Sequence, residues 1–270
     1  MTGKRVFFLS FFLTFFVMLC SFIGLYWVLD ITPRETVGTQ QKGVPILKAG
    51  IDDSKTLLLC AKNESTEFFF LIKFNALQNK VSVVSMPRTF RLSLADRTLS
   101  QSLEYAGMLQ CVYDLKQQFD IAVDYHLLCD YEKLGSIIGS FCGFHAGELG
   151  GSIPPAAQEL LFKSNDYIDA TIIIDSLKYA SQDLDNPLGL DFLNKSACSL
   201  LKYNLANLKD YGIDSVKENF SHLTTNFNVQ SLNKMHRILS LLLENSVTFD
   251  CLVLSDEKTA QDQLHSVLKE

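Results

Sequence analysis

The sequence predicts a layered α/β domain preceded by one transmembrane helix. Two observations support this prediction. Strand-like apolar runs alternate with amphipathic helical segments through residues 55–270, with short links between many of them, and this alternation is typical of α/β sheets. Ahead of the domain, residues 6–29 form an apolar block without a charged side chain, which has the length of a membrane span.

The first half of the domain supplies most of the predicted sheet. Apolar runs at residues 56–61, 67–75 and 81–86 indicate three strands. In the third run, apolar side chains alternate onto both sides, so we expect both faces of this strand to be covered. A further strand is expected at residues 121–129 and a last one at residues 247–254.

Helices are predicted between and after these strands. Thr98 and Gln101 make a capping box that begins one amphipathic helix, which continues to Phe119. Asp130 is expected to cap the next helix, whose apolar side chains extend to Phe141. The second half is predicted to be mostly helical, with helices at residues 155–162, 170–181, 190–208, 214–220, 231–245 and 257–269.

The amino-terminal block predicts a retained membrane anchor. As a helix, residues 6–29 would span about 36 Å, which exceeds the roughly 30 Å of a bilayer's hydrocarbon core. Lys4 and Arg5 precede the block and Asp30 follows it, so residues 1–5 are expected in the cytoplasm and the rest outside. A cleaved signal peptide fits less well, because the apolar stretch is too long and no small-residue cleavage motif follows. Residues 30–54 are a predicted tether, and residues 55–270 a predicted extracytoplasmic domain of a single-pass cell-membrane protein.

Composition and motifs exclude several classes of function. The chain carries a net charge of −6, which argues against binding to nucleic acid. It contains no GxSxG, Walker, HExxH or GxGxxG motif. Its five histidines are scattered without a partner at catalytic or metal-ligand spacing, so we expect them to be structural or on the surface.

A cluster of arginines predicts an anion site. Half of the six arginines, Arg88, Arg91 and Arg97, lie within ten residues directly after the third strand. The carboxyl ends of buried strands are where α/β sheets usually bind ligands, and a guanidinium group can hold a phosphate or carboxylate through two hydrogen bonds. The alternative is a solvated loop in which these arginines pair with Asp96 and Glu104.

The cysteines allow two interpretations. Cys20 falls in the predicted membrane span, and the other six, an even number, could form disulfides in an oxidising compartment. They are spaced singly through apolar segments, without a CxxC motif, which favours free thiols buried as small apolar side chains. These six are Cys60, Cys111, Cys129, Cys142, Cys198 and Cys251.

Several motifs in order resemble one known family. The strand KVSVVSMPR at residues 80–88 follows another apolar strand and precedes RTLS at 97–100 and LEYAG at 103–107. DYHLLCDYEKL then stands at residues 124–134. Together with the amino-terminal anchor, these motifs resemble the LytR-CpsA-Psr family over residues 56–143.

The resemblance implies an extracytoplasmic three-layer α/β/α domain with a central mixed sheet. It also implies phosphotransfer of a glycopolymer, such as teichoic acid or capsule, from a polyprenyl-pyrophosphate carrier to peptidoglycan. In such a domain Arg88, Arg91 and Arg97 would bind the pyrophosphate, Arg88 and Glu67 would be catalytic, and Glu67 would hold Mg²⁺. A hydrophobic pocket would take the polyprenyl chain.

The match departs from the family pattern at several positions. Thr89 replaces the aspartate after the Ser-Ile-Pro-Arg motif, Ser65 stands where an arginine precedes the family's acidic residue, and residues 177–208, expected to be rich in arginine, contain none. Lysines at 178, 195 and 202 lack the guanidinium fork. Two hypotheses follow. One is a divergent transferase that uses Arg88, Arg97 and Glu67, and the other is a noncatalytic domain of the same fold that binds an envelope lipid, a polymer or a protein.

Overall fold

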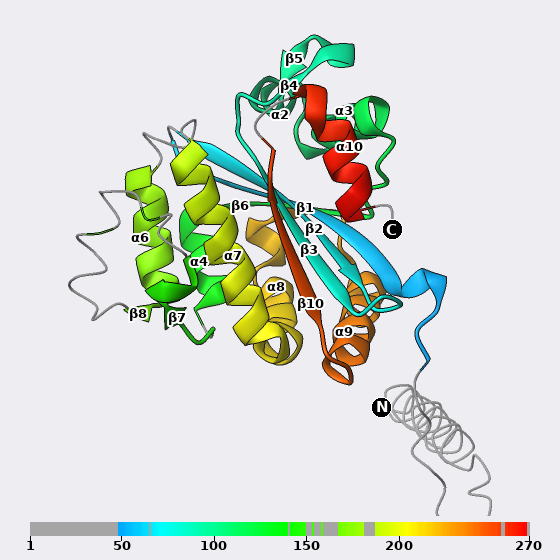
Figure 1. The fold of residues 1–270 in the computed structure, drawn as a ribbon, viewed down its shortest axis with the longest axis vertical. Coiled ribbons are helices and arrows are strands. Elements are labelled where there is room, and N and C mark those ends of the chain that lie inside the picture. Colours follow the sequence, from blue (N-terminus) through cyan, green and yellow to red (C-terminus); the bar gives the residue numbers. More distant parts are fainter. Residues whose placement is uncertain are drawn as a thin grey trace, which may run out of the picture. The chain divides into compact units, whose positions relative to one another are not determined.

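A mixed sheet of six strands forms the centre of the domain (Figure 1), in the order β10-β3-β2-β1-β6-β9. β1, β3, β6 and β10 run parallel to one another, while β2 and β9 are antiparallel to their neighbours. The strands are β1 Ser54–Lys62, β2 Glu67–Asn75, β3 Lys80–Met86, β6 Tyr125–Asp130, β9 Thr224–Thr225 and β10 Thr248–Val253. The sheet is therefore mixed, as expected.

The computed structural model describes residues 48–64, 66–139, 141–149, 153, 158, 167–180, 187–254 and 257–268. Among these residues no helix combines the length and apolar character needed to cross a membrane. The anchor predicted at residues 6–29 and nearly all of the helix predicted at 155–162 lie outside the described residues.

Two helical layers cover the two faces of the sheet (Figure 1). We call α2, α3 and α10 the α2 layer, and α4, α6, α7, α8 and α9 the α7 layer. Each layer has its own apolar core against the sheet. The helices are α2 Leu99–Ala106, α3 Met108–Phe119, α4 Tyr131–Ile138, α6 Ala170–Ala180, α7 Pro187–Asn207, α8 Ile213–Glu218, α9 Val229–Leu243 and α10 Glu257–Leu268.

β2 shows why the sheet is buried on both sides. Its sequence EFFFLIKFN is apolar at nearly every position. Phe68, Phe70 and two further alternate side chains belong to the core of the α7 layer, while Phe69 and Leu71 belong to the core of the α2 layer. Because successive side chains of a strand point to opposite faces, only a continuous apolar run can fill both cores.

Short irregular elements complete the fold. β4 Arg91–Leu92 pairs with β5 Arg97–Thr98 around the 3-10 turn η2 Ser93–Ala95, and β7 Phe144–His145 pairs with β8 Tyr167–Ile168. A π-helix, η4 Leu208–Gly212, follows α7 directly, and further 3-10 turns are η1 Ile51–Asp53, η3 Ala146–Leu149 and η5 Phe220–His222.

Two of the predicted elements are shorter than expected. The single helix expected from Thr98 to Phe119 is two helices, α2 and α3, because Gly107 takes a positive φ of 75° between them. The strand expected from residue 121 begins only at Tyr125, because Asp124 is used otherwise: its carboxylate accepts hydrogen bonds from Lys55 Nζ at 2.7 Å and Thr56 N at 2.9 Å.

The cysteines differ in part from the prediction of free thiols. Cys198 on α7 and Cys251 on β10 form a disulfide, so the prediction was wrong for this pair. Cys60, Cys111 and Cys129 are free and buried, as predicted, and Cys142 is free but exposed. The disulfide fastens α7 to the edge strand of the sheet.

Candidate functional site

The candidate site lies where the parallel strands end, which we call the carboxyl edge of the sheet. Glu67 begins β2 opposite Lys62, the last residue of β1. Tyr131 begins α4 directly after β6, and Arg88 follows β3 by two residues. The four consecutive strands β3, β2, β1 and β6 thus bring together side chains that are far apart in the sequence.

Ser100 connects Glu67 and Arg88. Its hydroxyl donates a hydrogen bond to Oε1 of Glu67, and its backbone N–H donates to the carbonyl oxygen of Arg88 at 3.1 Å. Ser100 lies in the first turn of α2, which the predicted capping box of Thr98 and Gln101 does begin. The structure therefore brings two of the predicted site residues into one cluster.

Tyr131 is a site residue that the sequence reasoning missed. Only 3% of it is exposed, and its hydroxyl lies 3.0 Å from Oγ1 of Thr66. Burial raises the pKa of the Tyr131 phenol, while the bond to Thr66 and the charge of Arg88 lower it and the charge of Glu67 raises it. The phenol is therefore neutral, and because the hydroxyl of Thr66 donates to Oδ1 of Asn63, the phenol donates to the oxygen of Thr66. The sequence did carry a signal for Tyr131: it directly follows Asp130, the residue that ends the buried parallel strand β6 and caps α4.

Arg91 and Arg97 are paired with carboxylates of their own. Nη2 of Arg91 lies 2.7 Å from Oδ1 of Asp96 in an exposed pair, as the alternative reading of the arginine loop proposed. Nε of Arg97 lies 3.4 Å from Oδ2 of Asp114, and its guanidinium group covers the ring of Tyr105 at 4.8 Å. Their part in pyrophosphate binding stays a prediction.

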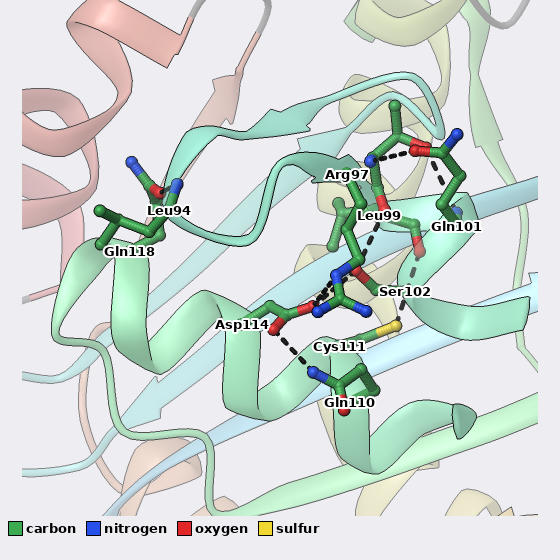
Figure 2. A network of polar contacts seen from close by, with 10 residues as sticks. Leu94, Arg97, Leu99, Gln101, Ser102, Gln110, Cys111, Asp114 and Gln118 are labelled. Atoms are coloured by element: carbon green, nitrogen blue, oxygen red, sulfur yellow. Dashed lines mark hydrogen bonds and ion pairs between the residues drawn. The ribbon is translucent and has the colours of Figure 1, made fainter. Parts of the chain in front are cut away.

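Asp114 is the centre of a polar network between α2 and α3 (Figure 2). Its carboxylate also accepts hydrogen bonds from Oγ of Ser102 at 2.7 Å and from Nε2 of Gln110 at 2.8 Å. Arg97 points into this network in Figure 2 and completes it from β5. The position of Arg97 is thus explained by the packing of the α2 layer.

The described side chains around Glu67 do not form a complete metal-binding set of their own. Among the described residues, no group of three or more His, Cys, Asp or Glu side chains converges in a way that could hold a metal ion. Magnesium is often held by one or two carboxylates together with phosphate oxygens of the substrate. A magnesium ion at Glu67 would therefore take most of its ligands from a bound pyrophosphate and water.

Two adjoining apolar cavities lie in the core of the α7 layer. Their volumes are about 130 and 100 Å³. The smaller one reaches Phe68, the neighbour of Glu67, and the ring of Phe68 packs against that of Tyr131 with centroids 5.6 Å apart. The residues that line both cavities are Leu59, Ile72, Leu134, Ile138, Phe141 and Leu201.

Comparison with known proteins rests on structure. No protein-family model and no curated protein matches the sequence. Among solved structures, Lin1025 from Listeria innocua is similar with a TM-score of 0.58 and 14% identity, over 80% of this chain and 99% of that protein. TagT from B. subtilis is similar with a TM-score of 0.54 and 11% identity, over 83% of this chain and 95% of TagT.

This chain has a LytR-CpsA-Psr-like fold. A further similar structure is EF0465 from Enterococcus faecalis, described as a transcriptional regulator, with a TM-score of 0.57 and 12% identity over 82% of this chain and 91% of that protein. TagT also matches in structures bound to LIIa-WTA and LI-WTA. At these identities the likeness shows the LytR-CpsA-Psr-like fold, and the activity has to be argued from the site.

Proposed function

We propose that this protein binds a glycopolymer linked to a polyprenyl pyrophosphate and attaches the polymer to peptidoglycan at the cell membrane. The observation that carries the proposal is the closeness of an apolar cavity to Tyr131: Phe68 lines the cavity and its ring packs against that of Tyr131, while Glu67, the preceding residue of β2, faces Ser100 on the other side of the sheet. A ligand with a hydrocarbon chain and an anionic head matches this arrangement. The TagT structures with bound wall teichoic acid are similar in fold and support the same class of ligand.

The proposed reaction is a phosphotransfer. A hydroxyl group of the acceptor attacks the phosphorus nearest the sugar, the bond from that phosphorus to the bridging oxygen breaks, and polyprenyl phosphate and a proton are released. The guanidinium group of Arg88 is the donor suited to stabilise the charge that develops on the phosphate oxygens. Magnesium at Glu67, when bound, would neutralise further negative charge.

A second candidate function is binding without transfer. It is favoured by the pairing of Arg91 with Asp96 and of Arg97 with Asp114, since a pyrophosphate carries several negative charges. Of the three clustered arginines, only Arg88 lies beside Tyr131 and Glu67. On this account the protein holds a lipid-linked polymer or an envelope partner, and another protein performs the chemistry.

One experiment separates the two candidates. The full-length chain with Mg²⁺, a polyprenyl-pyrophosphate disaccharide and peptidoglycan is tested for transfer, and binding of the lipid is measured in parallel. Arg88→Ala should weaken binding roughly 10- to 100-fold, because a charge-assisted pair of hydrogen bonds is lost, and it should reduce transfer. Arg91→Ala is the matched comparison: because that guanidinium group is exposed and paired with Asp96, we propose, against the prediction from the sequence, that Arg91 takes no part in pyrophosphate binding and that this variant changes neither quantity.

Each outcome favours one candidate. Transfer that is lost in Arg88→Ala and kept in Arg91→Ala supports the transferase. Lipid binding without transfer, again dependent on Arg88, supports the binding function. If the wild-type chain binds no polyprenyl pyrophosphate, both candidates are wrong.

A further inference from the structure

A polar cleft of about 900 Å³ adjoins the candidate site. It lies between α4 and the beginning of α6, with the segment 141–143 and β8 completing its wall. Tyr131 lines this cleft and also contacts Thr66 at the carboxyl edge. The cleft therefore shares Tyr131 with the candidate site, on the side of α4 and α6, while the smaller apolar cavity reaches Phe68, whose ring packs against Tyr131.

The lining of the cleft favours a ligand without phosphate. Three carboxylates, those of Glu132, Asp169 and Asp175, line it, together with the hydroxyl groups of Ser136 and Thr171. The described lining contains no lysine or arginine, so a phosphate group would be repelled here. Carboxylates and hydroxyl groups accept hydrogen bonds from sugar hydroxyls.

Asp169 has a fixed orientation in this lining. One of its oxygens, Oδ1, accepts a hydrogen bond from the backbone N–H of Ile172 at 2.8 Å. This bond caps the first turn of α6 and leaves the second carboxylate oxygen for another donor.

Tyr167 gives the cleft an aromatic wall that is held in place. Tyr167 is 41% exposed, yet its ring lies directly against the backbone of Gly143. A Cβ atom at Gly143 would collide with the Tyr167 ring and with the carbonyl oxygen of Ile168. The ring of His145 also meets the ring of Tyr167 edge-on, with centroids 5.8 Å apart. An exposed ring that is held in this way can stack on the apolar face of a sugar at little cost in conformational entropy.

We propose that this cleft binds the acceptor, a glycan strand rich in hydroxyl groups and lacking phosphate. The proposal rests on the function proposed above, because a transfer reaction needs a second substrate next to the pyrophosphate. The cleft volume is at the upper end of the range for small-molecule sites. Tyr131 begins α4, whereas Tyr167 lies against Gly143 beyond the end of α4, so a strand of several sugars stacked on Tyr167 and running along α4 would extend toward the carboxyl edge.

Glycan binding by the full-length chain tests the proposal directly. The probe is chitotetraose, a neutral glycan, and the comparison is tetragalacturonate, an anionic glycan of the same length. We expect saturation-transfer NMR and calorimetry to show binding of chitotetraose and much weaker binding of tetragalacturonate. Tyr167→Ala should weaken chitotetraose binding roughly tenfold because the stacking surface is lost, and Tyr167→Phe should retain it.

Two controls separate the cleft from general effects on folding and on the donor. Tyr203→Ala removes a similarly exposed tyrosine from α7, outside the lining of the cleft, and should not change binding. Farnesyl pyrophosphate, used as the donor probe, should bind the wild type and Tyr167→Ala equally.

The outcomes separate this inference from the proposed function. If chitotetraose does not bind, if tetragalacturonate binds as well, or if Tyr167→Ala binds as the wild type does, the cleft assignment is wrong and the donor site is unaffected. If chitotetraose binds through Tyr167 but farnesyl pyrophosphate does not bind at all, the cleft is a glycan site and the proposed transfer function is wrong.

Discussion

The two helical layers of this domain use their polar and apolar side chains differently. In the α2 layer, polar groups between the helices are joined to one another: Asp114 alone has contacts with Ser102, Gln110 and Arg97. In the α7 layer, the core encloses two apolar cavities, and a polar cleft opens beside α4 and α6. Among the described residues, the α2 layer is thus held together by polar contacts between its helices, while the cavities and the cleft considered above lie in the α7 layer.

The three clustered arginines also differ in the part of the domain that they contact. Arg97 completes the network of the α2 layer, and Arg91 closes the small β4–β5 hairpin on Asp96. Arg88 lies between the two layers, with its backbone bonded to Ser100 of the α2 layer and its charge acting on Tyr131 of the α7 layer. Proximity in sequence therefore does not give these three residues the same partners.

Truncation of one leucine in each layer should give the largest effect. Leu115 on α3 is fully buried in the α2 layer, and Leu115→Ala should cost about 3–5 kcal/mol of unfolding free energy through lost transfer energy and a new void. Leu201 on α7 already borders both cavities, so Leu201→Ala should cost less, about 2 kcal/mol, because fewer contacts are lost. Urea unfolding of the full-length chain measures both, and equal costs would contradict the contrast between the layers.

Loss of the disulfide tests how far the α7 layer depends on its link to the sheet edge. Cys198 and Cys251 are 53 residues apart, and a loop of this length predicts that Cys198→Ser with Cys251→Ser lowers the unfolding free energy by about 2–4 kcal/mol. Thermal unfolding with and without a reductant should show the same loss in the wild type. Cys142→Ser, at an exposed free thiol, is the control and should unfold as the wild type does.

Removal of Asp114 should destabilise the α2 layer by a smaller amount. Asp114 is only 3% exposed, while the Arg97 side chain that pairs with it keeps 27% of its surface in contact with solvent. Asp114→Ala leaves a partly buried guanidinium group and the amide of Gln110 without their acceptor, while the hydroxyl of Ser102 still has the carbonyl oxygen of Thr98, at a cost of about 2–3 kcal/mol. Asp96→Ala breaks the exposed pair with Arg91 and should change the unfolding free energy by less than about 1 kcal/mol. Similar costs for the two variants, measured by urea unfolding, would show that the network is not structural.

The elements that could be predicted from the sequence are those with a strong local pattern. β2 was predicted at its observed bounds because a nine-residue apolar run flanked by turns fits only a strand covered on both faces. The break between α2 and α3 was missed, although Leu103 and Met108 are five residues apart and Gly107 lies between them. A step of five does not fit a continuous helical face, so the signal was present.

The pairings that define the site could not be read from local patterns. Arg97 forms an ion pair with Asp114 on the far side of the α2–α3 turn. Tyr131 is hydrogen-bonded to Thr66, 65 residues earlier, and Cys198 is joined by a disulfide to Cys251, 53 residues later. Each partner is set by the order of strands in the sheet and by which face a helix covers. Sequence indicated Arg88 and Glu67 as candidates, but the topology was needed to show that Ser100 and Tyr131 join them.

Acidification tests the ion pair that ties Asp53, at the beginning of the domain, to Arg237 of the α7 layer. Asp53 is buried, and its two carboxylate oxygens accept from Nε and Nη2 of Arg237 on α9 at 3.1 and 3.3 Å. The hydrogen bond from Arg237 holds the pKa of Asp53 below its usual value, although burial opposes this. A carboxyl group with a lowered folded pKa contributes stability that is present above its unfolded pKa of about 3.9 and is lost as the pH falls through the folded pKa. The unfolding free energy of the wild type should therefore exceed that of Asp53→Asn at pH 7, and the difference should shrink as the pH falls below about 4.

Asp52→Asn, at the exposed neighbouring carboxylate, is the control for net charge. A difference between the wild type and Asp53→Asn that stays constant down to pH 3 would mean that the ion pair contributes through packing alone, and that the α7 layer holds the start of β1 without help from charge.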